Sequence, residues 1–103
     1  MQARSINLTA IPPWLIQCTN LKALNLGDNS ISKLVECEIP PKLSYLNLPF
    51  NKMTEADLSF LLRLNHVNIA ANELTKINIA NLNNLEHLDI SANKFSTFEL
   101  KGH

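Results

Sequence analysis

Aliphatic residues and asparagines recur along this chain in a pattern that returns every 21 or 22 residues. The segments that carry the pattern read LKALNLGDN (21–29), LSYLNLPFN (43–51), LNHVNIAAN (64–72) and LEHLDISAN (85–93). In each segment the first, fourth and sixth residues are aliphatic and the ninth is asparagine. A fixed period of this length is typical of a solenoid, in which each repeat forms one coil and stacks on its neighbours.

The spacing inside each segment predicts a short β-strand with aliphatic side chains on its inner face. Side chains alternate between the two faces of a strand, so the fourth and sixth residues face the core and their neighbours face solvent. After the asparagine, apolar residues occupy two further columns: Ile31, Met53, Leu74, Phe95 and Leu34, Ala56, Ile77, Phe98. Leu8 and Ile11 fit the same columns, which indicates an earlier, degenerate repeat.

The pattern LxxLxLxxN resembles the leucine-rich repeat family, and the likeness covers nearly the whole chain. The resemblance implies an α/β solenoid: a right-handed coil with a short parallel β-sheet on its concave side and irregular or short helical segments on its convex side. We expect one domain over residues 1–103, with a degenerate first repeat (1–20), repeats at 21–42, 43–63 and 64–84, and an incomplete last repeat at 85–103. The repeat length fits the short cytosolic class of the family best.

Two segments of the return side are expected to form helical turns. Thr54 and Asp57 have the spacing of a capping box ahead of the apolar run 58–62. Pro12 and Pro13 suit the start of a comparable turn ahead of Trp14.

The asparagine that ends each segment is the one polar residue expected to face inward. Where a coil turns away from its strand, backbone N–H and C=O groups lose their partners in the sheet, and a side-chain amide can both donate and accept. We therefore predict a structural asparagine ladder made of Asn29, Asn51, Asn72 and Asn93.

The outward residues of the strands should line the concave face, where we expect the function to lie. The columns of this face are Ala23, Tyr45, His66, His87, then Asn25, Asn47, Asn68, Asp89, and Phe50 lies just beyond them. Exposed, rigid aromatic side chains are typical anchors of protein interfaces. We predict that a partner protein binds Tyr45, Asn47, Phe50, His66, Asn68, His87 and Asp89. The alternative is structural: leucine-rich repeats commonly carry Asn or Asp in the second column, and Tyr45 and Phe50 could simply pack over Pro49.

Composition and motifs argue against several other functions. Nine basic and nine acidic residues balance without a block of one sign, which disfavours a nucleic-acid partner. No apolar run is long enough for membrane insertion. His66, His87 and Asp89 are close in register, but an open face without supporting groups makes a poor metal site. No HExxH or Gly-flanked serine motif occurs, and two glycines cannot build a phosphate-binding loop. We expect no catalysis, no metal and no cofactor.

Cys18 and Cys37 occupy columns that are otherwise filled mainly by aliphatic residues. Because a free cysteine behaves as a small buried hydrophobe, we expect both thiols to be reduced and structural. In the same column as Cys18, Pro40 interrupts the apolar series, and the neighbouring Ile39 is expected to replace it. Asn7 begins an Asn-Leu-Thr triplet, the acceptor pattern for N-glycosylation, which we regard as coincidental.

These observations favour a non-enzymatic, cytoplasmic module that binds or scaffolds a partner protein in signalling. One alternative is the targeting or regulatory segment of a larger signalling enzyme, such as a phosphatase, cyclase or kinase, and another is a secreted recognition domain. Phe95, Phe98 and Leu100 enter a last coil that is cut short at His103. Since solenoid ends need caps, we expect end-to-end self-association or continuation into further repeats.

Overall fold

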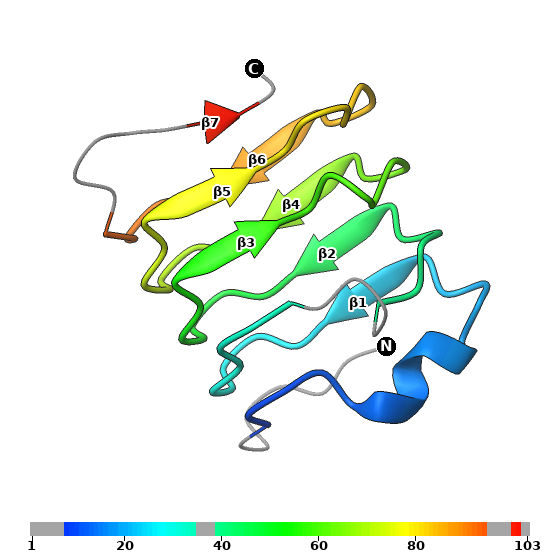
Figure 1. Ribbon diagram of the computed structural model, residues 1–103, viewed down its shortest axis with the longest axis horizontal. Coiled ribbons are helices and arrows are strands. Elements are labelled where there is room, and N and C mark those ends of the chain that lie inside the picture. Colours follow the sequence, from blue (N-terminus) through cyan, green and yellow to red (C-terminus); the bar gives the residue numbers. More distant parts are fainter. Residues whose placement is uncertain (1–7, 35–38, 95–99, 102–103) are drawn as a thin grey trace.

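The computed structural model describes residues 8–34, 39–94 and 100–101 of the chain. Its one helical element is a 3₁₀ helix, and all other elements are short strands (Figure 1). In chain order they are η1 (Pro13–Gln17), β1 (Ala23–Asn25), β2 (Tyr45–Asn47), β3 (Glu55–Asp57), β4 (His66–Asn68), β5 (Lys76–Asn78), β6 (His87–Asp89) and β7 (Leu100–Lys101). Within these ranges, no helix has the length and apolar character needed to cross a bilayer.

The strands form two parallel sheets that follow the coils of a solenoid. The first sheet has the order β1-β2-β4-β6, and the second has the order β3-β5-β7 (Figure 1). In the first sheet, Leu24 pairs with Leu46, Leu46 with Val67, and Val67 with Leu88. Equivalent residues of successive repeats therefore pair with one another, and each repeat contributes one strand to this sheet. This confirms the predicted solenoid and its short parallel sheet.

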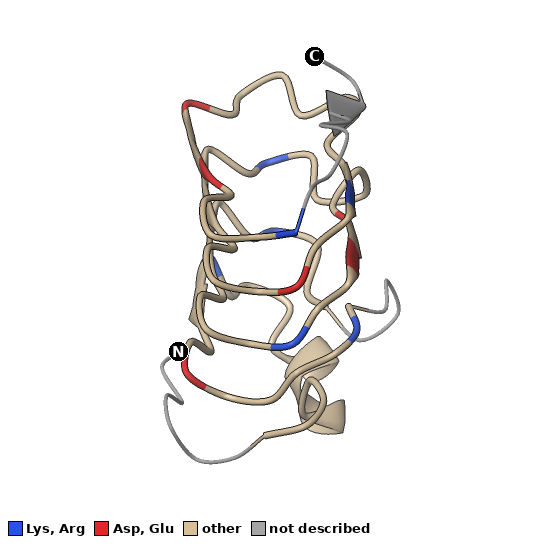
Figure 2. Ribbon diagram, turned by 90° about the vertical axis from the view of Figure 1, so that its left-hand side faces the viewer, with Lys and Arg blue, Asp and Glu red and all other residues tan. Residues whose placement is uncertain are grey.

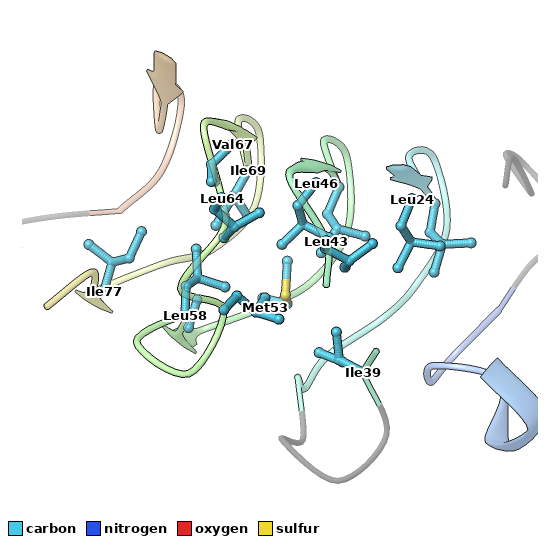
Figure 3. Packing of buried hydrophobic residues seen from close by; sticks show 14 of the residues in the cluster. Leu24, Ile39, Leu43, Leu46, Met53, Leu58, Leu64, Val67, Ile69 and Ile77 are labelled. Atoms are coloured by element: carbon cyan, nitrogen blue, oxygen red, sulfur yellow. The ribbon is translucent and has the colours of Figure 1, made fainter. Parts of the chain in front are cut away.

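The core lies between the two sheets and is filled by the aliphatic columns. Leu24, Leu46 and Val67 are completely buried (Figure 3). The residues that directly follow the strands, Leu26, Leu48 and Ile69, are completely buried as well. The column after the asparagine is equally buried at Ile31, Met53 and Leu74. Ile39 is 1% exposed and does fill the place that Pro40 interrupts. Each coil thus buries its aliphatic side chains against those of the coils on either side.

The convex side differs from the expected short helices. Residues Glu55–Asp57 form strand β3, so the helical turn predicted from Thr54 and Asp57 is wrong. The reason is lateral pairing: β3 pairs in register with β5, and Ala56 points into the core with 5% of its surface exposed. The Asp57 carboxylate accepts hydrogen bonds from the Ser59 N–H and hydroxyl instead of capping a helix.

Among the residues that the structure describes, η1 alone provides a helical segment on the return side, and it begins at Pro13 as the paired prolines predict. Elsewhere in the described ranges the return side makes isolated turns, such as the one closed by the Leu61 N–H and the Leu58 carbonyl. The described residues thus form a parallel-strand solenoid with almost no helix, and the helical convex side of the expected α/β fold is not seen among them.

Several residues that were assigned roles from the sequence lie outside the described ranges. They are Asn7, Cys37, Phe95 and Phe98. The other cysteine, Cys18, is a free thiol that is half-buried and packs against the hydrophobic core. Figure 2 shows basic and acidic residues interspersed along the coils, without a block of one sign on the described part of the chain.

Candidate functional site

A ladder of asparagine side chains lies beneath the candidate site and holds successive coils together. The Asn51 Oδ1 accepts the Ile31 N–H at 3.0 Å, one coil earlier in the chain. Its Nδ2 donates to the carbonyls of Leu26, Leu48 and Pro49 at 3.0, 3.2 and 3.2 Å. The corresponding Oδ1 atoms of the other ladder residues accept the N–H groups of Leu8, Met53 and Leu74. These amides satisfy backbone groups that the strands leave unpaired, which is a structural role.

Three ring side chains stack on the concave face above this ladder. Parallel pairing places Tyr45 beside His66, and His66 beside His87. The Tyr45 and His66 ring centroids are 4.3 Å apart with 6° between the ring planes, and the His66 and His87 centroids are 4.9 Å apart with 7° between the planes. Since neighbouring strands lie about 4.8 Å apart, the rings follow the spacing of the sheet itself. The result is a continuous column of rings, which we call the ring stack.

The surroundings of His66, the central ring of the stack, lower its pKa. Partial burial lowers the pKa of His66 below its usual 6.5, and the nearby charge of protonated His87 lowers it further. In the next column, hydrogen bonds from the Ser91 hydroxyl and N–H lower the pKa of the Asp89 carboxyl below 3.8. Above pH 6.5 His66 is therefore neutral and Asp89 is ionised.

Lowering the pH below 6.5 should destabilise the fold through His66. An unfolded histidine takes up its proton near 6.5, whereas folded His66 does so only at a lower pH. The unfolded state thus binds more protons between those two values. The stability contributed by the neutral ring is complete above 6.5 and is lost as the pH falls through the pKa of the folded state.

Melting temperatures measured across this window test the effect. They should fall less steeply for His66→Phe, which keeps a flat ring that takes up no proton, than for the unmodified chain. Equal slopes for the two proteins would contradict a role for His66 protonation.

The second column of the concave face is largely engaged within the chain. The Oδ1 atoms of Asn25, Asn68 and Asp89 each accept the backbone N–H two residues further on, at 3.2, 3.0 and 3.0 Å. These side chains shape the turn that ends each strand. Two of the residues predicted to bind a partner, Asn68 and Asp89, are thus already used in the fold.

Asn47 is the exception in this column. The residue two positions further on is Pro49, which has no N–H to donate. Among the described residues, no group forms a hydrogen bond with the Asn47 side chain, and this side chain is half-buried. The sequence analysis did not distinguish Asn47 from its neighbours, although Pro49 was the signal that could have done so.

Phe50 projects from the turn after the same strand. It has a φ of 57°, a left-handed conformation that the corresponding residues Asp28, Ala71 and Ala92 share. For a residue with a side chain this conformation costs about 1 to 2 kcal/mol. Phe50 is nonetheless 59% exposed. The left-handed conformation recurs at this position in every coil and so belongs to the turn, whereas a large exposed ring is found there only at Phe50 among these four residues.

Pro49 is buried, and its ring packs against the preceding coil. A Cβ added at Gly27 would come within 3.1 Å of the Pro49 Cγ and Cδ. Gly27 therefore provides the space for the proline. Tyr45 stays 36% exposed and Phe50 more so, which leaves both rings accessible.

A hollow of about 440 Å³ lies away from the concave face, along residues 32–34, 54–57 and 76–78. Its charged side chains are of both signs, and its one ion pair joins Lys76 Nζ and Glu55 Oε1 at 4.0 Å with both side chains mostly exposed. Such a pair is solvated and contributes little. In the described ranges, no group of three or more His, Cys, Asp or Glu side chains could hold a metal ion.

The architecture defines a class: a parallel solenoid with one strand of the first sheet per repeat and a ladder amide after each strand. Comparison with protein families agrees, because residues 84–102 match the family model described as Leucine Rich Repeat. The match supports a leucine-rich repeat family, in agreement with the LxxLxLxxN pattern. A search of curated proteins gave no match to the chain. A leucine-rich repeat suggests a protein–protein interaction module.

Proposed function

We propose that this protein is a non-enzymatic module that binds a partner protein on its concave face. The ring stack of Tyr45, His66 and His87 is the observation that carries the proposal. Flat rings fixed at 4.3 and 4.9 Å lose little conformational freedom on binding, so they are suitable anchors. Phe50 extends the same surface at the end of strand β2.

The rigid support beneath the stack favours recognition over catalysis. Strands β1, β2, β4 and β6 hold the face in register, and the ladder amides fix the turns that follow. Preorganised surfaces of this kind bind without paying the cost of ordering flexible loops. The described concave face offers no nucleophile positioned against a base, which is the arrangement that catalysis of acyl transfer would use.

An affinity pull-down tests this proposal. The intact chain and a triple variant with Tyr45→Ala, Phe50→Ala and His66→Ala are used as baits in parallel, and recovered proteins are identified by mass spectrometry. We expect the triple variant to lose specific partners, because truncating central aromatic anchors typically costs 2 kcal/mol or more each, about 30-fold in affinity. A triple variant with Glu55→Ala, Thr75→Ala and Lys76→Ala, on the second sheet, is the matched control and should keep them.

Recovery of the same proteins by the intact chain and by the concave-face variant would place the binding surface elsewhere. Circular dichroism of each bait shows whether it is folded, so a lost partner can be separated from a lost fold.

A further inference from the structure

The ring stack has an open end at Tyr45. One face of the Tyr45 ring lies against His66, and the strand on its other side is β1, where Ala23 is the paired residue. Alanine has no ring with which to continue the stack. Among the described residues no other ring lies against that second face of Tyr45. The stack therefore ends at Tyr45, and Tyr45 and Ala23 are both exposed. We call the position beyond the Tyr45 ring, with Ala23 as its floor, the Tyr45 slot.

The side chains around this slot are suited to an uncharged ligand. The segment 43–51 contains no charged residue, in contrast to the corresponding segments 21–29 and 85–93. The nearest charges in sequence to Ala23 are Lys22 and Asp28, which have opposite signs and belong to the same coil. An arginine would stack well on tyrosine, but Lys22 directly precedes the floor of the slot and would repel it.

Asn47 adds a hydrogen-bonding group beside the slot. It lies two residues beyond Tyr45 on the same face of strand β2, and its carboxamide has no hydrogen bond within the described structure. A carboxamide both donates and accepts, so it matches the backbone amide of an extended peptide. The neighbouring coils lack such an unsatisfied side chain. Asn25 and Asn68, which occupy the same column, accept hydrogen bonds from the Gly27 and Ala70 N–H groups.

We propose that the Tyr45 slot receives an aromatic side chain from an uncharged, extended segment of the partner protein, whose backbone amide binds Asn47. This inference rests on the proposed function and identifies the chemistry of the partner. The incoming ring extends the stack as its fourth member at the spacing of the sheet. Phe50 then contacts the same segment further along, beyond Pro49.

Capped pentapeptides acetyl-Gly-Gly-X-Gly-Gly-amide, with Trp, Leu or Arg at X, test the proposal with the full chain. Binding is followed by NMR through the Tyr45 ring and the Asn47 side-chain amide resonances. The Trp peptide should bind about three- to tenfold more tightly than the Leu and Arg peptides, the ratio that an added aromatic pair provides. Tyr45→Phe should retain this preference, and Tyr45→Leu should abolish it.

Two further variants separate the slot from the rest of the concave face. Ala23→Leu fills the slot from its floor and should reduce binding of the Trp peptide about threefold or more. Glu55→Leu adds the same side chain to an exposed strand position of the second sheet and should leave binding unchanged. Pro49→Ala supplies an N–H for Asn47 and should weaken binding although every aromatic ring is kept.

The possible results distinguish this inference from the proposed function. A Trp peptide that shifts His87 and Asp89 resonances but is insensitive to Ala23→Leu would overturn the slot and leave concave-face binding intact. Tighter binding of the Arg or Leu peptide would overturn the aromatic assignment, and so would the absence of any binding. The proposed function itself is decided separately, by the pull-down with the concave-face variant.

Discussion

Replacing Leu46 with alanine should lower the free energy of unfolding by about 2 to 5 kcal/mol. Leu46 is completely buried in strand β2, and its neighbours in the same column are Leu24 and Val67. Removing the methine and the two methyl groups of the side chain loses their burial and leaves a cavity. The coils on both sides are held by strand pairing, so the cavity can collapse only partly. Because small domains are marginally stable, this is a large fraction of the total.

Urea unfolding followed by circular dichroism measures the effect as a shift of the midpoint. Leu62→Ala is the matched control, because Leu62 is 55% exposed and its truncation should change stability by only about 0.5 kcal/mol. Similar destabilisation in both variants would mean that the Leu24, Leu46 and Val67 column is not the continuous core that the structure shows.

Replacing Asn51 with alanine should cost about 1 to 3 kcal/mol of stability. The side chain connects two coils, since Oδ1 accepts the Ile31 N–H and Nδ2 donates to the Leu26 and Leu48 carbonyls. These carbonyls also accept from Asn29 and Asn72, so they keep a donor in the variant. The Ile31 N–H has no such substitute, and an unsatisfied buried donor accounts for most of the expected loss.

Asn47→Ala is the matched control for this experiment. It removes the same side chain four residues earlier in the same coil, where the amide makes no hydrogen bond in the described structure. Its free energy of unfolding should stay within about 0.5 kcal/mol of the unmodified chain. Equal losses at Asn51 and Asn47 would contradict the distinction between a ladder amide and a free one.

The two asparagines show how one repeat can separate structure from recognition. Asn51 faces inward and closes the turn, whereas Asn47 faces outward and is left without a donor by Pro49. Pro49 in turn fits because the preceding coil has Gly27 at the contact. The residues that distinguish segment 43–51 from the corresponding segments, Asn47 and Pro49, thus lie close together on the concave face, beside Tyr45 and Phe50.

Much of the fold could be predicted from the sequence because a solenoid repeats its own contacts. A residue in a strand column meets the same column in the next coil, so the period of the sequence predicts both burial and neighbours. Leu24, Leu46 and Val67 were assigned to the core on this basis, and their complete burial confirms it. The same register predicted that Tyr45, His66 and His87 would be adjacent, and the structure places them in a stack.

The convex side could not be predicted in the same way. Thr54 and Asp57 satisfy a local rule for starting a helix, but residues 55–57 gain more by pairing with strand β5 across coils. Strand pairing depends on a segment about one repeat away, which a local motif does not include. The orientation of the stacked rings could not be predicted for the same reason. The angles of 6° and 7° between the ring planes arise from contacts between coils.

The amino-acid sequence by itself determined the number of residues per coil, the inward columns and the outward stripes, because hydrophobic periodicity and strand alternation are properties of the chain alone. Only the tertiary structure decided that the return side forms a second sheet and that Asn68 and Asp89 are engaged in turns while Asn47 is not. It also decided that, among the described residues, a ring stacks on one face of Tyr45 only. Those features depend on which groups of neighbouring coils come within hydrogen-bonding or stacking distance, and that proximity exists only once the coils have stacked.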